Sequence, residues 1–109
     1  MTKEEIVTAL HVWALTKSEV QRVYVFGSRA RNDFQVDSDL DVAVELADGL
    51  DECNGLAYWM FVCDIYQSEL DKLFSYTVDQ EQLTPDTPTI ISAIERSSYL
   101  AYDKDHPLR

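Results

Sequence analysis

Asp39 and Asp41 are separated by one residue within a strongly alternating segment. In a β-strand, side chains two residues apart point to the same side with Cβ atoms roughly 6–7 Å apart, so both carboxylates can reach one point. Two like charges this close repel by about 1 kcal/mol in water, and by more near a low-dielectric surface. Mg²⁺ would remove that repulsion because it takes oxygen ligands. A pair of such ions about 3.5–4 Å apart can bind the attacking and leaving oxygens of a nucleotidyl transfer.

A Gly-Ser turn and two arginines precede the aspartates: Gly27-Ser28, Arg29 and Arg31. Glycine lets backbone N–H groups approach an anion closely, and a helix beginning at Ser28 would direct its amides at a phosphate. The Ser28 hydroxyl is a further donor, and the arginines add positive charge suited to triphosphate oxygens. Each feature alone is common on protein surfaces. Their order and spacing predict a site where the turn and cations hold nucleotide phosphates.

Other phosphate-binding and nucleophilic motifs are missing from the sequence. Neither G-x-x-x-x-G-K-[ST] nor G-x-G-x-x-G occurs, which argues against P-loop and Rossmann sites. Ser28 lacks the G-x-S-x-G context and a nearby histidine, so a hydrolase nucleophile is not expected.

The composition restricts the partners. Nine basic and twenty acidic residues give a formal charge of −11, which disfavours binding of bulk nucleic acid. An acidic surface suits metal ions or a basic protein partner, although it is equally explained as a solvated surface. Cys53 and Cys63 are the only cysteines, and we expect buried free thiols, no zinc site and a cytoplasmic setting. No apolar run approaches the length of a membrane span.

The length of 109 residues predicts a single domain over 1–109. Thr2 and Glu5 read as a capping box that opens a first helix, which ends near Lys17. Residue types and periodicity then predict strands over 20–26, 36–46 and 74–78, a helix from 56 past 70, a helix after Pro88, an edge strand over 99–102 and a loose tail over 103–109.

The helix that follows residue 55 is apolar around much of its circumference. Positions expected on its main apolar face are Leu56, Trp59, Met60, Cys63 and Leu70. Two interpretations stay open: the helix packs against both the sheet and the first helix, or one of its faces docks a partner.

Three segments in order, Gly27-Ser28, the Arg29-Ala30-Arg31 run and Ser38 to Val44, resemble the minimal nucleotidyltransferase (MNT) domain of the DNA polymerase β-like superfamily. Ten residues separate Ser28 from Asp39, which matches the Gly-Ser to Asp-x-Asp spacing of that family. The motif covers about a fifth of the chain, and the predicted order of elements agrees along nearly all of it. The resemblance implies a mixed α/β (α+β) fold with a small sheet of three to four strands packed against helices. It also implies ATP as substrate, a Gly-Ser contact to the triphosphate and two Mg²⁺ ions on the aspartates.

The resemblance also implies a third carboxylate on a later strand, which binds metal or acts as a base. Asp79, after a short strand-like segment, is the expected position, and Asp71 is the fallback. Family members often continue with apolar residues, whereas Gln80-Glu81 follows here. An ordinary turn residue at a strand end is the alternative reading of Asp79.

Small MNT domains resemble the antitoxins of HEPN–MNT toxin–antitoxin pairs, some of which transfer AMP to a tyrosine of the HEPN toxin. We therefore expect a Mg²⁺-dependent nucleotidyltransferase that modifies a hydroxyl of a HEPN partner. An antitoxin that neutralises its toxin by binding alone is the alternative. Transfer to a small molecule is less favoured, because such relatives usually carry an additional substrate-binding domain.

Overall fold

The computed structural model describes residues 2–31 and 38–106. Helices and strands follow one another as α1 (Lys3–Leu15), β1 (Val20–Phe26), α2 (Ser28–Arg31), β2 (Leu40–Leu46), α3 (Leu56–Leu73), β3 (Val78–Gln82), α4 (Pro88–Arg96) and β4 (Ser98–Asp103). The four strands form one sheet in the order β3-β2-β1-β4. β1 pairs antiparallel with β2 and β4, whereas β2 pairs parallel with β3. The predicted α/β fold with a small mixed sheet is confirmed.

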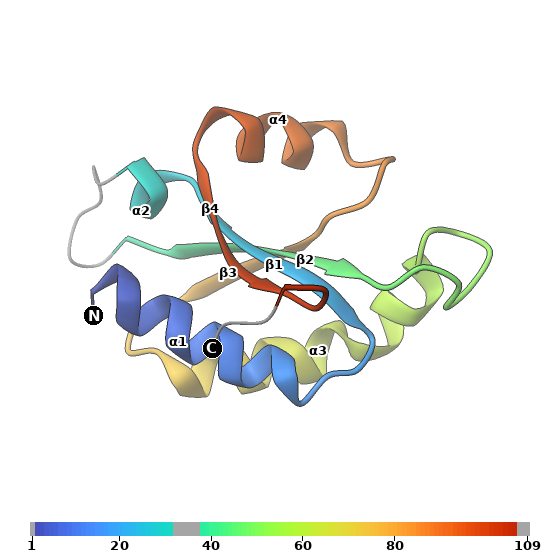
Figure 1. The fold of residues 1–109 in the computed structure, drawn as a ribbon, viewed down its shortest axis with the longest axis horizontal. Helices are drawn as coiled ribbons and strands as arrows, with labels where there is room; N and C mark the ends of the chain where they lie inside the picture. Colours follow the sequence, from blue (N-terminus) through green and yellow to red (C-terminus); the bar gives the residue numbers. More distant parts are fainter. Residues whose placement is uncertain (1, 32–37, 107–109) are drawn as a thin grey trace.

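The sheet has helices on both sides, and the two sides differ (Figure 1). α1 and α3 lie against one face, and α4 lies over the other. The core between the sheet and the α1–α3 layer takes every second residue of β2, namely Leu40, Val42, Val44 and Leu46. Because strand side chains alternate, Asp41, Ala43 and Glu45 of β2 are directed to the α4 side.

Local sequence signals account for several helix and strand ends. Thr2 and Glu5 form the predicted capping box at the start of α1, with each backbone N–H donating to the other side chain. β1 occupies the predicted residues 20–26 and ends where Gly27 takes a positive φ of 75°. Pro88 begins α4, as expected for a residue without an N–H to donate.

Two strand boundaries differ from the prediction. β2 begins at Leu40, after Ser38 and Asp39, and the earlier part of the predicted strand at 36–37 lies outside the described residues. The strand predicted over 74–78 is wrong in position, because β3 runs over Val78–Gln82. Phe74 is buried in the core and the chain turns before Val78, so the aromatic run reflects packing and not strand pairing.

The end of the chain is more ordered than predicted. Asp103, the first residue of the predicted loose tail, is buried as the last residue of β4 and forms an ion pair with Arg22 at 3.3 Å. Lys104 extends the contact, since its N–H donates to the Gln21 carbonyl. Residues 107–109 lie outside the described part of the chain.

α3 has one packed face and one exposed apolar face. Val62, Tyr66 and Leu70 are its buried residues. Of the positions expected on its main apolar face, Leu70 is buried, whereas Leu56 and Met60 are exposed. The exposed set, which we call the α3 patch, contains Leu56 (50% exposed), Met60 (72%), Phe61 (78%) and Ile65 (51%). The helix therefore meets the core along one stripe, with Tyr58 and Trp59 partly buried beside it, and presents the α3 patch outward.

The two cysteines are free, as predicted, but they are not buried: Cys53 is exposed and Cys63 is half-buried. Cys53 belongs to the turn before α3, and its backbone N–H donates to Oδ1 of Asp51 at 2.7 Å. No helix in the described ranges is long and apolar enough to cross a bilayer.

Candidate active site

Strand pairing brings the predicted site residues to one edge of the sheet. Phe26, the last residue of β1, pairs with Asp41 near the start of β2. Asp41 in turn pairs with Asp79 near the start of β3. Paired residues of neighbouring strands point to the same face about 5 Å apart, so the two carboxylates stand side by side on the α4 side of the sheet.

The Gly-Ser turn is packed directly against this pair. A Cβ placed on Gly27 would overlap Oδ2 of Asp41, and the positive φ of this residue is also unfavourable for other residue types. α2 begins at Ser28, as expected, and the N–H groups of Ala30 and Arg31 donate to the Gly27 carbonyl at 3.1 Å. The turn beside the carboxylates that the sequence predicts is therefore present, and only glycine fits its first position.

The electrostatics of Asp41 favour a cation at this edge. Burial raises the pKa of Asp41 to about 6, and the neighbouring charges of Asp79 and Asp39 contribute to the rise, while Arg31 acts in the opposite direction. Because the disfavoured state is the ionised one, a bound divalent ion would relieve both the desolvation and the repulsion. The donor set consists of carboxylate oxygens, the type that Mg²⁺ takes. The chemical type of these side chains suits such an ion.

Asp39 is exposed and lies immediately before β2, not within it as predicted. Within the described ranges, no three His, Cys, Asp or Glu side chains are gathered closely enough to hold a metal ion together. A site formed by three acids would therefore require the side chains of Asp39, Asp41 and Asp79 to rotate toward one another. The metal roles predicted for Asp39, Asp41 and Asp79 stay predictions.

The two candidates for the third carboxylate differ in position. Asp79 is exposed beside Asp41 and shifts the pKa of Asp41. Asp71 lies on α3, on the other side of the sheet, and accepts a hydrogen bond from Gln67 at 3.0 Å. Asp71 is not among the charges that act on Asp41.

The sequence interpretation missed Glu81, which pairs with Ala43 and lies two residues after Asp79 on the same strand. Burial, followed by the charge of Asp79, raises the pKa of Glu81. The period-two spacing of Asp79 and Glu81 was the available signal. It was not recognised because the strand was predicted to end at Val78, before both acids.

The two arginines after the turn occupy different environments. Arg31 is exposed, and its charge lowers the pKa of Asp41. Arg29 is only 6% exposed. Its Nη2 and Nε donate to the Ser38 carbonyl at 2.8 and 3.2 Å, and its guanidinium lies 3.8 Å from the centre of the Tyr76 ring. The phosphate contact predicted for Arg29 stays a prediction, and no sequence pattern indicated these contacts.

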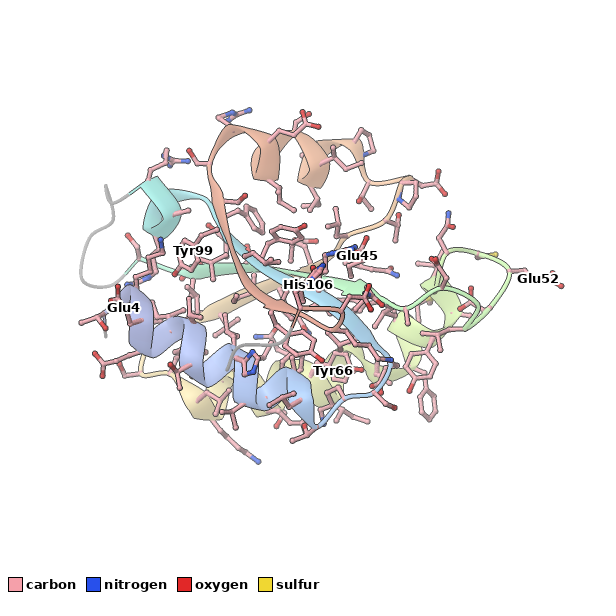
Figure 2. All side chains as sticks on the ribbon, in the orientation of Figure 1. Glu4, Glu45, Glu52, Tyr66, Tyr99 and His106 are labelled. Atoms are coloured by element: carbon pink, nitrogen blue, oxygen red, sulfur yellow. The ribbon has the colours of Figure 1, made fainter. Side chains whose placement is uncertain are left out.

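Aromatic rings line the same end of the sheet. Tyr76 stacks on Phe74 with ring centres 5.6 Å apart. Tyr99 of β4 lies at the α2 end of the molecule, as Figure 2 shows, and Lys3 Nζ stands 4.8 Å from its ring centre. Burial raises the pKa of Tyr99 to about 12, with Tyr76 adding to the shift and Arg29 opposing it.

Comparison with known proteins gives one family and a set of similar folds. The model of the polymerase β nucleotidyltransferase family matches residues 11–107. No curated protein matches the sequence.

Solved structures similar to this chain include toxin–antitoxin complexes. One, a toxin–antitoxin with AMP-PNP, matches with a TM-score of 0.58 and 23% identity over 95% of this chain and 75% of that chain. An MntA–HepT complex matches with a TM-score of 0.54 and 20% identity over 95% and 74%. A complex of tri-AMPylated Shewanella oneidensis HEPN toxin with MNT antitoxin matches with a TM-score of 0.51 and 21% identity over 93% and 74%. At these identities the similarity establishes a shared fold.

Proposed function

We propose, since this chain belongs to the polymerase β nucleotidyltransferase family, that it transfers a nucleotidyl group from ATP to a hydroxyl. The observation that carries the proposal is the pairing of Asp41 with Asp79 at the edge where Gly27 packs against Asp41. In this reaction the acceptor oxygen bonds to the α-phosphorus, the bond from that phosphorus to the bridging oxygen breaks, and pyrophosphate leaves.

Each group has a role in the proposed reaction. Asp39 and Asp41 hold Mg²⁺, and Asp79 completes that site or accepts the proton of the acceptor hydroxyl. Two bound Mg²⁺ ions would supply charge stabilisation for the transferred and leaving oxygens. Gly27 and Ser28 contact the β- and γ-phosphates, and Arg31 offsets their charge. The half-buried environment of Asp41 supports the metal role, because an ionised carboxylate there is otherwise disfavoured.

The acceptor is proposed to be a tyrosine hydroxyl of a HEPN-type partner in the cytoplasm, with this chain acting as the antitoxin. The similar structures support this proposal, because one is described as an AMPylated HEPN toxin bound to an MNT antitoxin. Another is described as a toxin–antitoxin with AMP-PNP, which supports ATP as the nucleotide.

The α3 patch supports partner binding. Its residues Met60 and Phe61 are 72% and 78% exposed, and large apolar side chains gathered on one face commonly mark interaction sites. The formal charge of −11 disfavours a second copy of this chain and favours a basic partner.

An antitoxin that works by binding alone is the second candidate, and the exposed α3 patch favours it because docking needs no chemistry. Exposed Asp39 and the lack of three gathered acidic side chains among the described residues are compatible with it. The two candidates make different predictions for an Asp39→Asn/Asp41→Asn double variant. A catalytic antitoxin loses neutralisation of its toxin, whereas a binding antitoxin keeps it.

Transfer of α-labelled AMP to the co-purified partner tests the primary proposal. Asp39→Asn should lower transfer by at least about 100-fold, in the range found when one electrostatic catalytic group is removed. Asp48→Asn changes an exposed aspartate in the turn after β2, at the opposite end of that strand from Asp41; it is the matched control and should leave nucleotide transfer unchanged. Undiminished transfer by Asp39→Asn would remove the mechanism.

A further inference from the structure

We infer that Arg29 is a positioning residue that holds the three site segments in register, and that it does not contact the nucleotide. This inference rests on the proposed function. Its guanidinium joins α2, which carries the Gly-Ser turn, to Ser38, which precedes Asp39, and to Tyr76, which precedes the strand of Asp79.

The contact with Ser38 fixes the approach to Asp39. Two donors of one planar group, Nη2 and Nε, meet the same backbone carbonyl at 2.8 and 3.2 Å. Asp39 is the next residue, and it lies outside the strand ladder that holds Asp41. The forked contact thus restrains a segment whose position β2 alone does not fix.

The contact with Tyr76 fixes the other side of the site. The guanidinium lies over the ring at 3.8 Å, well within the range of a cation–π contact. One residue later, the Thr77 carbonyl accepts the Leu40 N–H at 2.9 Å. The segments before β2 and β3 are therefore tied twice, once by this backbone bond and once through Arg29.

The burial of Arg29 argues against a phosphate-binding role. The residue is 6% exposed, and its planar face is covered by a ring. Arg31, two residues later, is exposed and is therefore the cation that a triphosphate in solvent can reach. Charge alone would suffice at a phosphate, whereas holding a carbonyl and a ring together needs the planar fork of arginine.

The lysine substitution distinguishes the two roles. Arg29→Lys keeps the charge and loses the fork, and Arg29→Met loses both. A positioning role predicts that both variants lower kcat and the affinity for Mn²⁺ by about 10- to 100-fold, as for residues that orient metal ligands, with little change in KM for ATP. Mn²⁺ affinity is measured by electron paramagnetic resonance with and without AMP-PNP. Arg31→Met is the matched comparison, and it should raise KM for ATP, which the Arg29 variants leave nearly unchanged.

A second pair of variants keeps the test valid if the Arg29 variants fail to fold. Tyr76→Leu removes the ring face and should reproduce the loss of Mn²⁺ affinity. Tyr76→Phe keeps the face and removes a buried hydroxyl that finds no hydrogen-bond partner among the described residues, so it should behave as wild type.

Wild-type kcat and Mn²⁺ affinity in Arg29→Lys, or in Tyr76→Leu, would overturn the positioning role while leaving the nucleotidyltransferase proposal intact. Wild-type protein that binds neither Mn²⁺ nor AMP-PNP would overturn both.

Discussion

The two faces of the sheet use the same strands for opposite purposes. On the α1–α3 side, Leu40, Val42 and Val44 are fully buried in a contiguous core. On the α4 side, the neighbouring Asp41 faces Asp79 and carries a pKa raised by burial and repulsion. The first face stabilises the fold, and the second holds like charges together at a cost in stability. Adjacent residues of one strand should therefore respond to mutation in opposite directions.

The largest effect on stability is expected on the core face. Leu40→Ala removes a fully buried side chain between two aspartates, and it should lower the free energy of unfolding by about 2–5 kcal/mol. Urea denaturation followed by circular dichroism measures this loss. An unchanged midpoint would mean that the core does not extend to the edge of the sheet.

The next largest effect on stability is expected at Gly27, in the turn between β1 and α2. Gly27→Ala should lower stability by about 1–2 kcal/mol for the positive φ, with further loss from overlap with Asp41. Gly49→Ala is the matched control, because Gly49 has a φ of 84° and a Cβ added there would meet no atom within 4 Å. The difference between the two variants measures the close approach of the turn to the carboxylate. Equal thermal midpoints would contradict that approach.

Asp41→Asn should change stability in the opposite direction to Leu40→Ala. The pKa of Asp41 rises from 3.8 to about 6 on folding, so ionisation destabilises the folded protein as pH rises through that window. After allowance for solvent screening, the metal-free variant should gain about 1 kcal/mol at pH 7 and nothing below about pH 4. Thermal unfolding in EDTA at both pH values measures the gain, and nucleotidyl transfer should be lost.

The α3 patch contrasts with the buried stripe of the same helix. Phe61→Ser should change the free energy of unfolding by less than about 0.5 kcal/mol, because the side chain is 78% exposed. Binding of the proposed partner, measured by calorimetry, should weaken at the same time. Unchanged partner binding would place the docking surface elsewhere.

A further pH-dependent effect is expected at the contact between the two core-side helices. Glu69 of α3 accepts hydrogen bonds from Lys17 Nζ at 2.8 Å and Trp13 Nε1 at 3.2 Å, and the Lys17 bond is the main cause of its lowered pKa. A lowered carboxyl pKa adds stability above the unfolded value of 4.5 that is lost as pH falls. Glu69→Gln should therefore cost at most about 1 kcal/mol at pH 7, with the difference from wild type vanishing at acid pH.

Much of the fold was predictable because its signals are local. The capping box at Thr2, the end of β1 at Gly27 and the alternation of Leu40, Val42 and Val44 each lie within a few residues. β3 was misplaced because its residues, Val78 to Gln82, are mostly polar. An edge strand with one wet face has a weak pattern, and its parallel partner lies more than thirty residues away in β2.

Residue type and short spacing were enough to predict the chemistry of the site. Gly27 tolerates a left-handed turn, and the carboxylates of Asp39 and Asp41, which are separated by one residue, repel each other unless a cation lies between them. Both properties belong to residues that are close along the chain. The tertiary structure, in contrast, determined which acid lies beside Asp41 and which arginine is buried. Asp79 is brought there by strand pairing, and Arg29 turns inward onto Ser38 and Tyr76. Such contacts depend on how distant segments pack, which no local pattern encodes.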